Sequence, residues 1–323
     1  MEYWIDIMHF SVSGIEISPF IPFIVAFVIS FFTSMGGVSG AFLLLPFQVS
    51  ILGFTSPSVS STNLVYNIVA IPSGVYRYIR EGRMAWPLAW VIIAGTLPGL
   101  FAGVIIRIKY FPDAKNFKFF IGCVLIYIAF RLLYDLTPWG VRSKARTLAL
   151  EDKFKESFRN NDREYLKKDS GKSIKTLSFS ITRYSYEFYG EEFSFNTIVL
   201  FILTLIVGLI GGIYGIGGGA IIAPFLIAIF GLPVYTISGA ALLGTFVTSI
   251  FGVLIYTLIA PVFDYTGLSI IPDWKLGVIF GAGGFLGIYF GARFQKYFPA
   301  RIIKLILGCV IMFLSLKYII DFF

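Results

Sequence analysis

The chain has 323 residues, of which 57% are hydrophobic and 14% are charged, and its formal net charge is +8. Soluble globular domains contain about 45 to 50% apolar residues, so this composition excludes that class and predicts a polytopic membrane protein. A positive balance in such a protein is typical of Lys and Arg in cytoplasmic loops, so we expect no binding to nucleic acid.

Segments without charge mark the expected membrane spans. Residues 17–76 and 193–263 contain no Asp, Glu, Lys, Arg or His, and each exceeds the roughly 20 residues that one helical span requires. Shorter runs of the same kind follow at residues 84–106, 119–130, 276–292 and 305–316. The sequence therefore predicts an all-α protein that crosses the membrane several times.

The two halves of the chain repeat each other. Twelve of the 42 residues from Gly37 to Tyr78 are identical to the residue 178 positions later. A shift of 188 then aligns a stripe of spaced glycines in one half with a stripe in the other, Gly95, Gly99 and Gly103 with Gly283, Gly287 and Gly291. Because the landmarks keep their order, we interpret residues 17–135 and 194–321 as two transmembrane repeats.

A charged insert separates the repeats at residues 136–193. Residues 137–192 hold twelve Lys or Arg and nine Asp or Glu. The alternation in SFSITRYSYEFYGEEF, residues 178–193, predicts a short β-hairpin. We expect a small cytoplasmic insert, and we favour a solvated linker while leaving a regulatory or docking module open.

Loop charges predict opposite orientations for the two repeats. Three arginines in residues 77–83 place that loop in the cytoplasm, whereas the corresponding loop of the second repeat, residues 261–273, carries two aspartates and no cation. The corresponding loops then lie on opposite sides of the membrane, so the repeats are inverted. Three other basic residues oppose this assignment because they would lie outside: Lys109, Lys115 and Lys118.

Inversion requires an odd number of crossings or partial crossings in each repeat. We therefore expect four long transmembrane helices plus one short broken or re-entrant helix per repeat. In the first repeat the two pieces would be residues 20–35 and 39–53. The second piece, at about 1.5 Å per residue, is shorter than the roughly 30 Å of a hydrocarbon core.

Each repeat contains a glycine-rich break in an apolar helix. The second break reads GIYGIGGGAIIAPFL at residues 212–226, and its copy begins at Gly37. Non-helical backbone at membrane depth is tolerated where it is buried in protein or lines a cavity, and paired breaks are typical of transport sites. A helix that restarts after Gly40 or Gly218 directs free N–H groups at its ligand, which favours an anion. The alternative is that these glycines only permit close helix packing, as we expect for the glycine stripes.

Neutral polar side chains follow the breaks. Helical spacing places Asn63, Tyr66 and Asn67 on one face, and the equivalent face of the second repeat carries Thr245 and Thr248. The candidate substrate-binding residues are therefore Gly37, Ser39, Gly40, Asn63, Tyr66, Asn67, Gly215, Gly217, Gly218, Thr245 and Thr248. The asparagines have an equal alternative role as hydrogen-bonding links between helices. Ser60 and its counterpart Ser238 are interpreted as binding residues or as caps of the following helix.

The pattern G-x-G-G-G at residues 215–219, with Pro224 five residues later, its copy ending at Pro46, and the loop YIREGRMAW resemble the sulfite exporter TauE/SafE family of membrane permeases. The resemblance covers both repeats. It implies export of small sulfur oxyanions or organosulfonates, such as sulfite or sulfoacetate, by a multi-pass protein of the cytoplasmic (inner) membrane. The first copy reads GGVSG, with Ser39 where the second has Gly217, so the exact substrate stays open.

Other functions remain alternatives to this exporter. An anion channel would also explain the breaks, as would a permease for a different small organic anion. An intramembrane enzyme would need a nucleophile with its base, a carboxylate pair or a metal cluster, and the charge-free runs offer none, so we expect no enzyme activity, no catalytic residue, no metal site and no cofactor. The expected partners are a small anionic substrate and the lipid bilayer, with a homodimer left open.

The broken segments also lack acids and histidines, so a buried proton relay is not expected. Passive or potential-driven export, coupling to a cation held by backbone carbonyls, and a relay at the membrane edge stay open. The two cysteines, Cys123 and Cys309, each follow a glycine in an apolar run and are predicted to be buried packing thiols.

Overall fold

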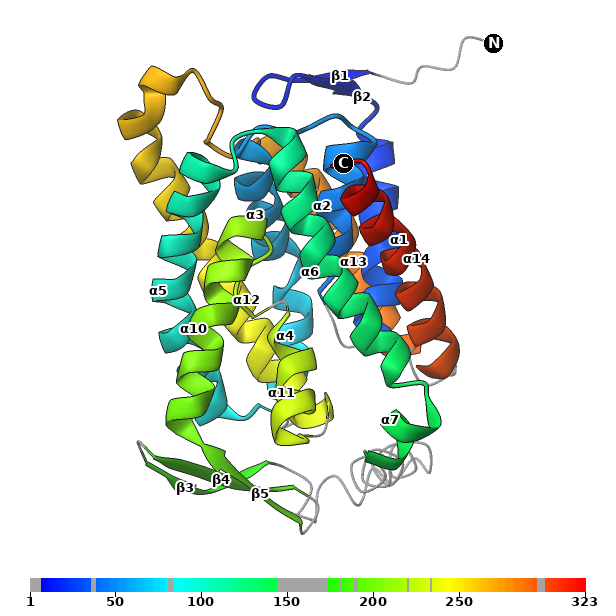
Figure 1. Cartoon of the computed structure of the whole chain (residues 1–323), viewed down its shortest axis with the longest axis vertical. Helices are drawn as coiled ribbons and strands as arrows, with labels where there is room; N and C mark the ends of the chain where they lie inside the picture. The colour runs from blue at the N-terminus through cyan, green and yellow to red at the C-terminus, as the bar shows by residue number, and fades with distance from the viewer. Residues whose placement is uncertain are drawn as a thin grey trace.

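The computed structural model describes residues 7–35, 39–80, 84–143, 174–180, 182–188, 191–219, 221–232, 234–294 and 300–323. Helices form the body of the molecule, a small hairpin lies at one end and a small sheet lies at the other (Figure 1). We call these the hairpin end and the sheet end. The C-terminal end of the last helix lies at the hairpin end (Figure 1).

Among the described residues, six helices are long and apolar enough to cross a bilayer, which confirms a polytopic membrane protein. They are the full or partial extents of α5 (Trp86–Tyr110), α6 (Ala114–Tyr134), α10 (Thr197–Tyr214), α12 (Val234–Ile259), α13 (Trp274–Phe294) and α14 (Ala300–Ile320). A 3-10 helix, η1 (Ala260–Thr266), continues α12 at the hairpin end.

Shorter helices surround the first break. α1 (Phe20–Met35) has the bounds expected for the first piece, and α2 (Ala41–Ser50) lies within the second. The chain then continues through α3 (Ser58–Ala70) and α4 (Pro72–Arg80). Pro72 has no N–H to donate, so the helix is interrupted between α3 and α4.

The second break begins where α10 ends. Gly215 caps α10 with a left-handed φ of 79°, and Gly217 follows with a φ of 77°. Such dihedrals cost little only for glycine, which has no Cβ. The chain then turns into the short α11 (Ile222–Phe230).

The glycine stripes are packing surfaces, as expected. A Cβ atom on Gly99 would lie 2.2 Å from the carbonyl oxygen of Leu205 in α10, and one on Gly287 would lie 2.4 Å from that of Phe27 in α1. Each stripe thus lets two helix backbones approach closely. As a result, α5 of the first half packs along α10 of the second, and α13 of the second half packs along α1 of the first.

The prediction for the cysteines is wrong, because Cys123 and Cys309 are both exposed and free. The glycine before each of them is the residue that faces the neighbouring helix: a Cβ on Gly122 would lie 3.0 Å from Tyr318 in α14, and one on Gly308 would lie 2.8 Å from Leu133 in α6. In a helix the next residue is turned by about 100°, so each thiol points away from that contact.

The hairpin end is tied to the helices by an acidic side chain. Strand β1 (Met8–Phe10) pairs antiparallel with β2 (Ile15–Ile17). In the turn between them, the Ser13 hydroxyl donates to Oδ2 of Asp273 at 2.9 Å. The other oxygen of Asp273 accepts from the amide of Leu276 at 3.2 Å and so caps the start of α13.

The insert carries more β-structure than predicted. Strands β3 (Lys175–Phe179), β4 (Arg183–Phe188) and β5 (Glu191–Asn196) form an antiparallel sheet in that order, and β5 runs directly into α10. The short helix α7 (Pro138–Ser143) lies at the start of the insert. The most charged part of the insert, residues 144–173, lies outside the described residues.

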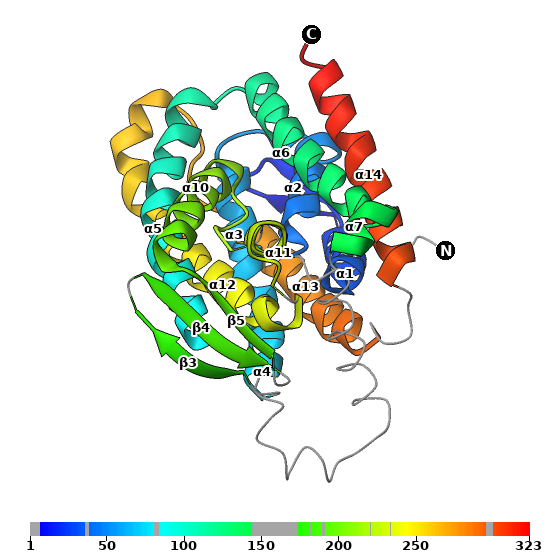
Figure 2. The same ribbon diagram turned by 60° about the horizontal axis from the view of Figure 1, so that its bottom comes forward.

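One face of this sheet packs on the second half of the molecule, as Figure 2 shows from the sheet end. The Tyr186 hydroxyl lies 2.9 Å from Oγ1 of Thr236 in α12, and the rings of Phe195 and Phe230 are 5.2 Å apart. Burial raises the pKa of Tyr184 and of Tyr186, so both phenols stay protonated. The sheet therefore packs against the helices, while a regulatory or docking role of the insert stays a prediction.

Candidate functional site

The helix α3 lies between the two breaks and links them. The side-chain amide of Asn63 donates to the carbonyl oxygen of Ala41 at 3.1 Å and to that of Gly215 at 2.9 Å. One helical turn further along the same face, the amide of Asn67 donates to the carbonyl oxygen of Ile216 at 2.9 Å. Two breaks that lie far apart in the sequence therefore meet at one face of α3.

Polar side chains surround the described part of the first break. The Ser39 hydroxyl donates to Oδ1 of Asn67 at 3.2 Å and accepts from the amide of Ala41 at 3.3 Å. The Tyr66 hydroxyl lies 2.7 Å from that of Ser30. A Cβ on Gly40 would lie 2.6 Å from this Tyr66 hydroxyl, so the absence of a side chain makes room for the phenol.

The second break packs against three other helices. A Cβ on Gly215 would lie 2.4 Å from Cα of Ser60 in α3, and one on Gly218 would lie 2.5 Å from Cβ of Thr96 in α5. The amide of Gly218 donates to Oγ1 of Thr248 in α12 at 3.2 Å. The glycines of this break therefore face α3, α5 and α12, and close packing is part of their role.

The predicted site residues do converge. Gly37 lies outside the described residues, and the other ten are buried around the two breaks. Their hydrogen bonds favour the linking role that was the alternative for the asparagines, because both amides donate to backbone carbonyls. The hydroxyls of Thr245 and Thr248 likewise donate to carbonyls one turn earlier in α12, at 2.8 and 2.7 Å. Whether these residues bind substrate stays a prediction.

Ser60 does not cap α3, contrary to one of its two interpretations. Pro57 occupies the N-cap position, and Ser60 lies inside the helix. Its hydroxyl accepts from Nε of Arg107 at 3.4 Å. No local pattern predicts this contact, because the partner lies 47 residues away on another helix.

Sequence reasoning missed two neutral residues beside the breaks. Gln48 of α2 donates from Nε2 to Oδ1 of Asn63 at 3.3 Å, while its Oε1 is buried. Ser249 of α12 is fully buried, and a Cβ on Gly217 would lie 3.0 Å from its hydroxyl. Within the described part of the chain, neither Oε1 of Gln48 nor the hydroxyl of Ser249 has a hydrogen-bond partner. Buried polar atoms of this kind call for a ligand, a water or an ion.

Arg107, near the end of α5, was also missed, because it lies one residue beyond a charge-free run. It is fully buried. Nη2 donates to the carbonyl oxygen of Thr55 at 3.3 Å and Nη1 donates to that of Phe111. The guanidinium carbon lies 3.6 Å from the centre of the Phe117 ring. The signal available in the sequence was a cation inside an otherwise apolar helix end.

An open groove of about 580 Å³ lies elsewhere, at the sheet end between α5, α10 and β3. Trp90, Phe179 and Phe201 are among the residues that line it, and its surface is almost wholly apolar. Small anions are held by hydrogen-bond donors, so this groove does not suit one. The breaks are the better candidate.

Comparison with known proteins identifies the family. The family described as Sulfite exporter TauE/SafE matches residues 22–318, which is nearly the whole chain. No curated protein and no solved structure matches it. The match includes both breaks, α3 and the helices that pack around them, so the chain belongs to the sulfite exporter TauE/SafE family, whose members are membrane transporters of sulfite-type anions.

Proposed function

We propose that this protein exports small sulfur-containing anions, such as sulfite, sulfoacetate or related organosulfonates, across the cytoplasmic membrane through a site between the two breaks. The observation that carries the proposal is the convergence of the breaks on Asn63, which donates to the backbone of both. Unwound backbone that meets in this way is typical of transporter sites. The family match supplies the class of substrate.

We also propose that the two repeats are inverted. The first break continues into α2, which ends at the hairpin end: the hydroxyl of Ser50 lies 2.6 Å from that of Tyr318, close to the C-terminal end of α14. The second break continues into α11, which ends at the sheet end, where Phe230 packs against Phe195. Equivalent helices that lead from the breaks to opposite ends support inversion, as does the reciprocal packing of α1 on α13 and of α10 on α5.

The membrane potential is the driving force that fits this site best. The segments around the breaks carry no acid or histidine that would bind a coupled proton. An inside-negative potential favours the exit of an anion by about 2.3 kcal/mol per charge per 100 mV. Export should therefore respond more strongly to potential than to a pH gradient of equal energy.

Transport from liposomes tests the proposal. We expect reconstituted protein to release sulfite or an organosulfonate faster than protein-free liposomes do, and faster still when the imposed potential drives anions out. Chloride and acetate serve as comparison anions for selectivity. Currents far above transporter turnover would indicate a channel, and release of acetate without any sulfur anion would indicate a permease for a different substrate.

Labelling of introduced cysteines tests the inversion. Gly53 and Gly231 are equivalent in the repeat, both have positive φ, and a Cβ on either would meet nothing within 4 Å. In a background with Cys123→Ala and Cys309→Ala, we expect Gly53→Cys and Gly231→Cys to react from opposite sides of the membrane with an impermeant maleimide. Reaction of both from one side would contradict inverted repeats.

A further inference from the structure

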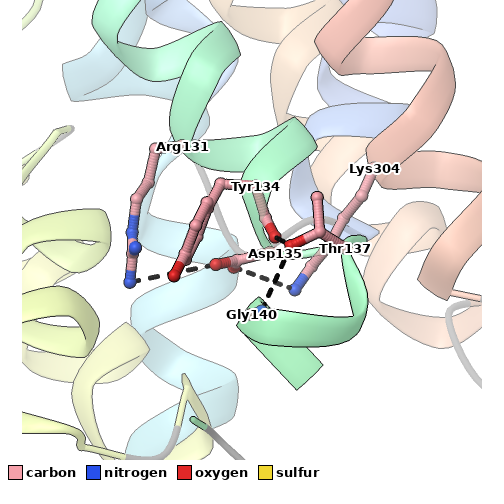
Figure 3. A network of polar contacts seen from close by, with 6 residues as sticks. All are labelled: Arg131, Tyr134, Asp135, Thr137, Gly140 and Lys304. Atoms are coloured by element: carbon pink, nitrogen blue, oxygen red, sulfur yellow. Dashed lines mark hydrogen bonds and ion pairs between the residues drawn. The ribbon is translucent and has the colours of Figure 1, made fainter. Parts of the chain in front are cut away.

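Arg107 and Arg131 lie on neighbouring helices but are balanced differently. At the sheet end of α6, Nη2 of Arg131 lies 3.8 Å from a carboxylate oxygen of Asp135, whose other oxygen lies 3.6 Å from Nζ of Lys304 in α14 (Figure 3). Arg107 lies near the C-terminal end of α5, away from the sheet end. The described residues place no acid against it, and its hydrogen-bond partners are two carbonyls and one hydroxyl. The cation that is better buried is therefore the one without a carboxylate.

Neutral acceptors leave the charge of Arg107 uncompensated. A buried charge costs several kcal/mol unless it is paired with an opposite charge or strongly hydrogen-bonded. A guanidinium has five N–H donors, and three hydrogen bonds are made to described residues, so donors remain for a further acceptor. The flat group is also held in place over the Phe117 ring. Such an arrangement is suited to reversible binding of an anion.

Arg107 is connected to the second break through α3. Its Nε bonds Ser60, and Ser60 is the residue against which Gly215 packs. Asn63, on the same face of α3, donates to the carbonyl oxygen of Gly215. On the α3 side, Ser60 alone therefore separates Gly215 of the break from Arg107.

The facing helix α12 supplies a matching row of hydroxyls. Ser249 lies beside Gly217 at the break. Tyr256, seven residues or about two helical turns further toward the hairpin end, is buried in one cluster with Val104 and Ile108, which flank Arg107 in α5. Among the described residues its hydroxyl has no hydrogen-bond partner. The helices α3 and α12 pack against each other along this length. We call the row of Asn63, Ser60, Ser249, Tyr256 and Arg107 the polar seam.

We propose that Arg107 binds the transported oxyanion on its way from the second break to the hairpin end. The inference rests on the proposed export function and adds to it a cationic group that binds the substrate. Two oxygens of a sulfite or sulfonate group fit the fork of a guanidinium. A halide is a single atom and cannot make this paired contact. A lysine in place of Arg107 could not offer it either, because an ammonium has no fork. Arg107 thereby favours oxyanions over halides.

The test compares Arg107→Gln with Arg131→Gln in liposomes. Loss of a charged hydrogen-bonding partner costs about tenfold or more in affinity, so we expect Arg107→Gln to raise the KM for sulfite by at least about tenfold and to reduce the preference for sulfite over chloride. Arg131→Gln removes a cation from the network shown in Figure 3, far from the seam, and should leave KM and preference unchanged. The melting temperature of each purified variant shows whether the chain stays folded.

The outcomes separate the inference from the function on which it rests. Wild-type KM and preference in a folded Arg107→Gln protein would overturn the role of Arg107 while leaving export intact. Failure of the wild-type protein to move any sulfur anion would instead overturn the export function. Should Arg107→Gln not fold, Arg107→Lys carries the test: it keeps the charge and loses the fork, so a raised KM with weaker preference for sulfite is expected, and wild-type values for both would overturn the proposal.

Discussion

The two breaks occupy equivalent positions in the repeats but are constrained differently. In the first break, Gly40 has an ordinary right-handed φ of −64°, and its missing side chain faces the hydroxyls of Tyr66 and Ser30. In the second break, Gly215 and Gly217 have left-handed φ values of 79° and 77°. The missing side chains of the second break face mainly backbone and Cβ atoms, which cannot move aside as a hydroxyl can.

This difference shows that a repeated sequence does not impose one chemistry on both copies. The first break is held by side-chain hydrogen bonds, which other residues can replace or weaken in small steps. The second break also makes hydrogen bonds to Asn63, Asn67 and Thr248, but its dihedrals and close contacts are ones that only glycine allows. Substitutions should therefore be tolerated at the first break and rejected at the second.

The largest expected effect is at Gly219. A Cβ there would lie 2.2 Å from the carbonyl oxygen of Ala241 and 2.6 Å from the amide of Thr245, both in the backbone of α12. Overpacking against backbone costs about 3 kcal/mol, so Gly219→Ala should lower the melting temperature sharply or prevent folding. Thermal unfolding of the purified protein measures this.

Gly40→Ala is the matched control at the first break. Its Cβ would meet the Tyr66 hydroxyl at 2.6 Å, and this hydroxyl is absent in Phe. We expect Gly40→Ala to cost about 1 kcal/mol and the cost to fall in a Tyr66→Phe background, where the double-mutant cycle isolates the clash. Equal losses for Gly40→Ala and Gly219→Ala would show that the two breaks are not constrained differently.

A smaller effect is expected at Asn63, which joins the breaks. Asn63→Ala removes the donors to Ala41 and Gly215 and leaves Nε2 of Gln48 without its acceptor. Buried polar groups that lose their partners destabilise by about 2 kcal/mol in total, which chemical denaturation in detergent would measure. Asn116→Ala on the exposed surface of α6 is the control, and a loss no larger than its own would mean that Asn63 does not hold the breaks together.

The sequence predicted the fold through signals that are local. The helix Phe20–Met35, the glycine stripes and the placement of the site residues at the breaks follow from runs, spacings and the repeat. The stripes are tightly packed: a Cβ added to Gly99 would lie 2.2 Å from the carbonyl oxygen of Leu205. A larger residue at Gly99 would therefore disrupt folding. Local pattern also underestimated the sheet, because its third strand merges into α10.

Hydrogen-bond partners that lie far apart in the sequence could not be predicted from it. The acceptors of Asn63 and Asn67 in the second break lie 152 and 149 residues away, so nothing in the local pattern shows that the amides are already bonded. Arg107 looked like the boundary of a span because a cation after an apolar run usually marks the water interface. Burial of such a residue depends on the neighbours that cover it, here Thr55, Phe111 and Phe117.

The smallest effect is expected for a substitution that makes the two breaks more alike. Ser39→Gly gives the first break the residue of the second and removes two long hydrogen bonds, of 3.2 and 3.3 Å, to Asn67 and Ala41. Because Oδ1 of Asn67 then lacks a buried donor, we expect a loss of about 1 kcal/mol, read from denaturation midpoints. The reverse change, Gly217→Ser, forces a side chain into a φ of 77° and to 3.0 Å from the hydroxyl of Ser249, so it should cost more. The exchange is therefore asymmetric, and Gly217→Ser no more costly than Ser39→Gly would mean that backbone geometry does not set the second break apart.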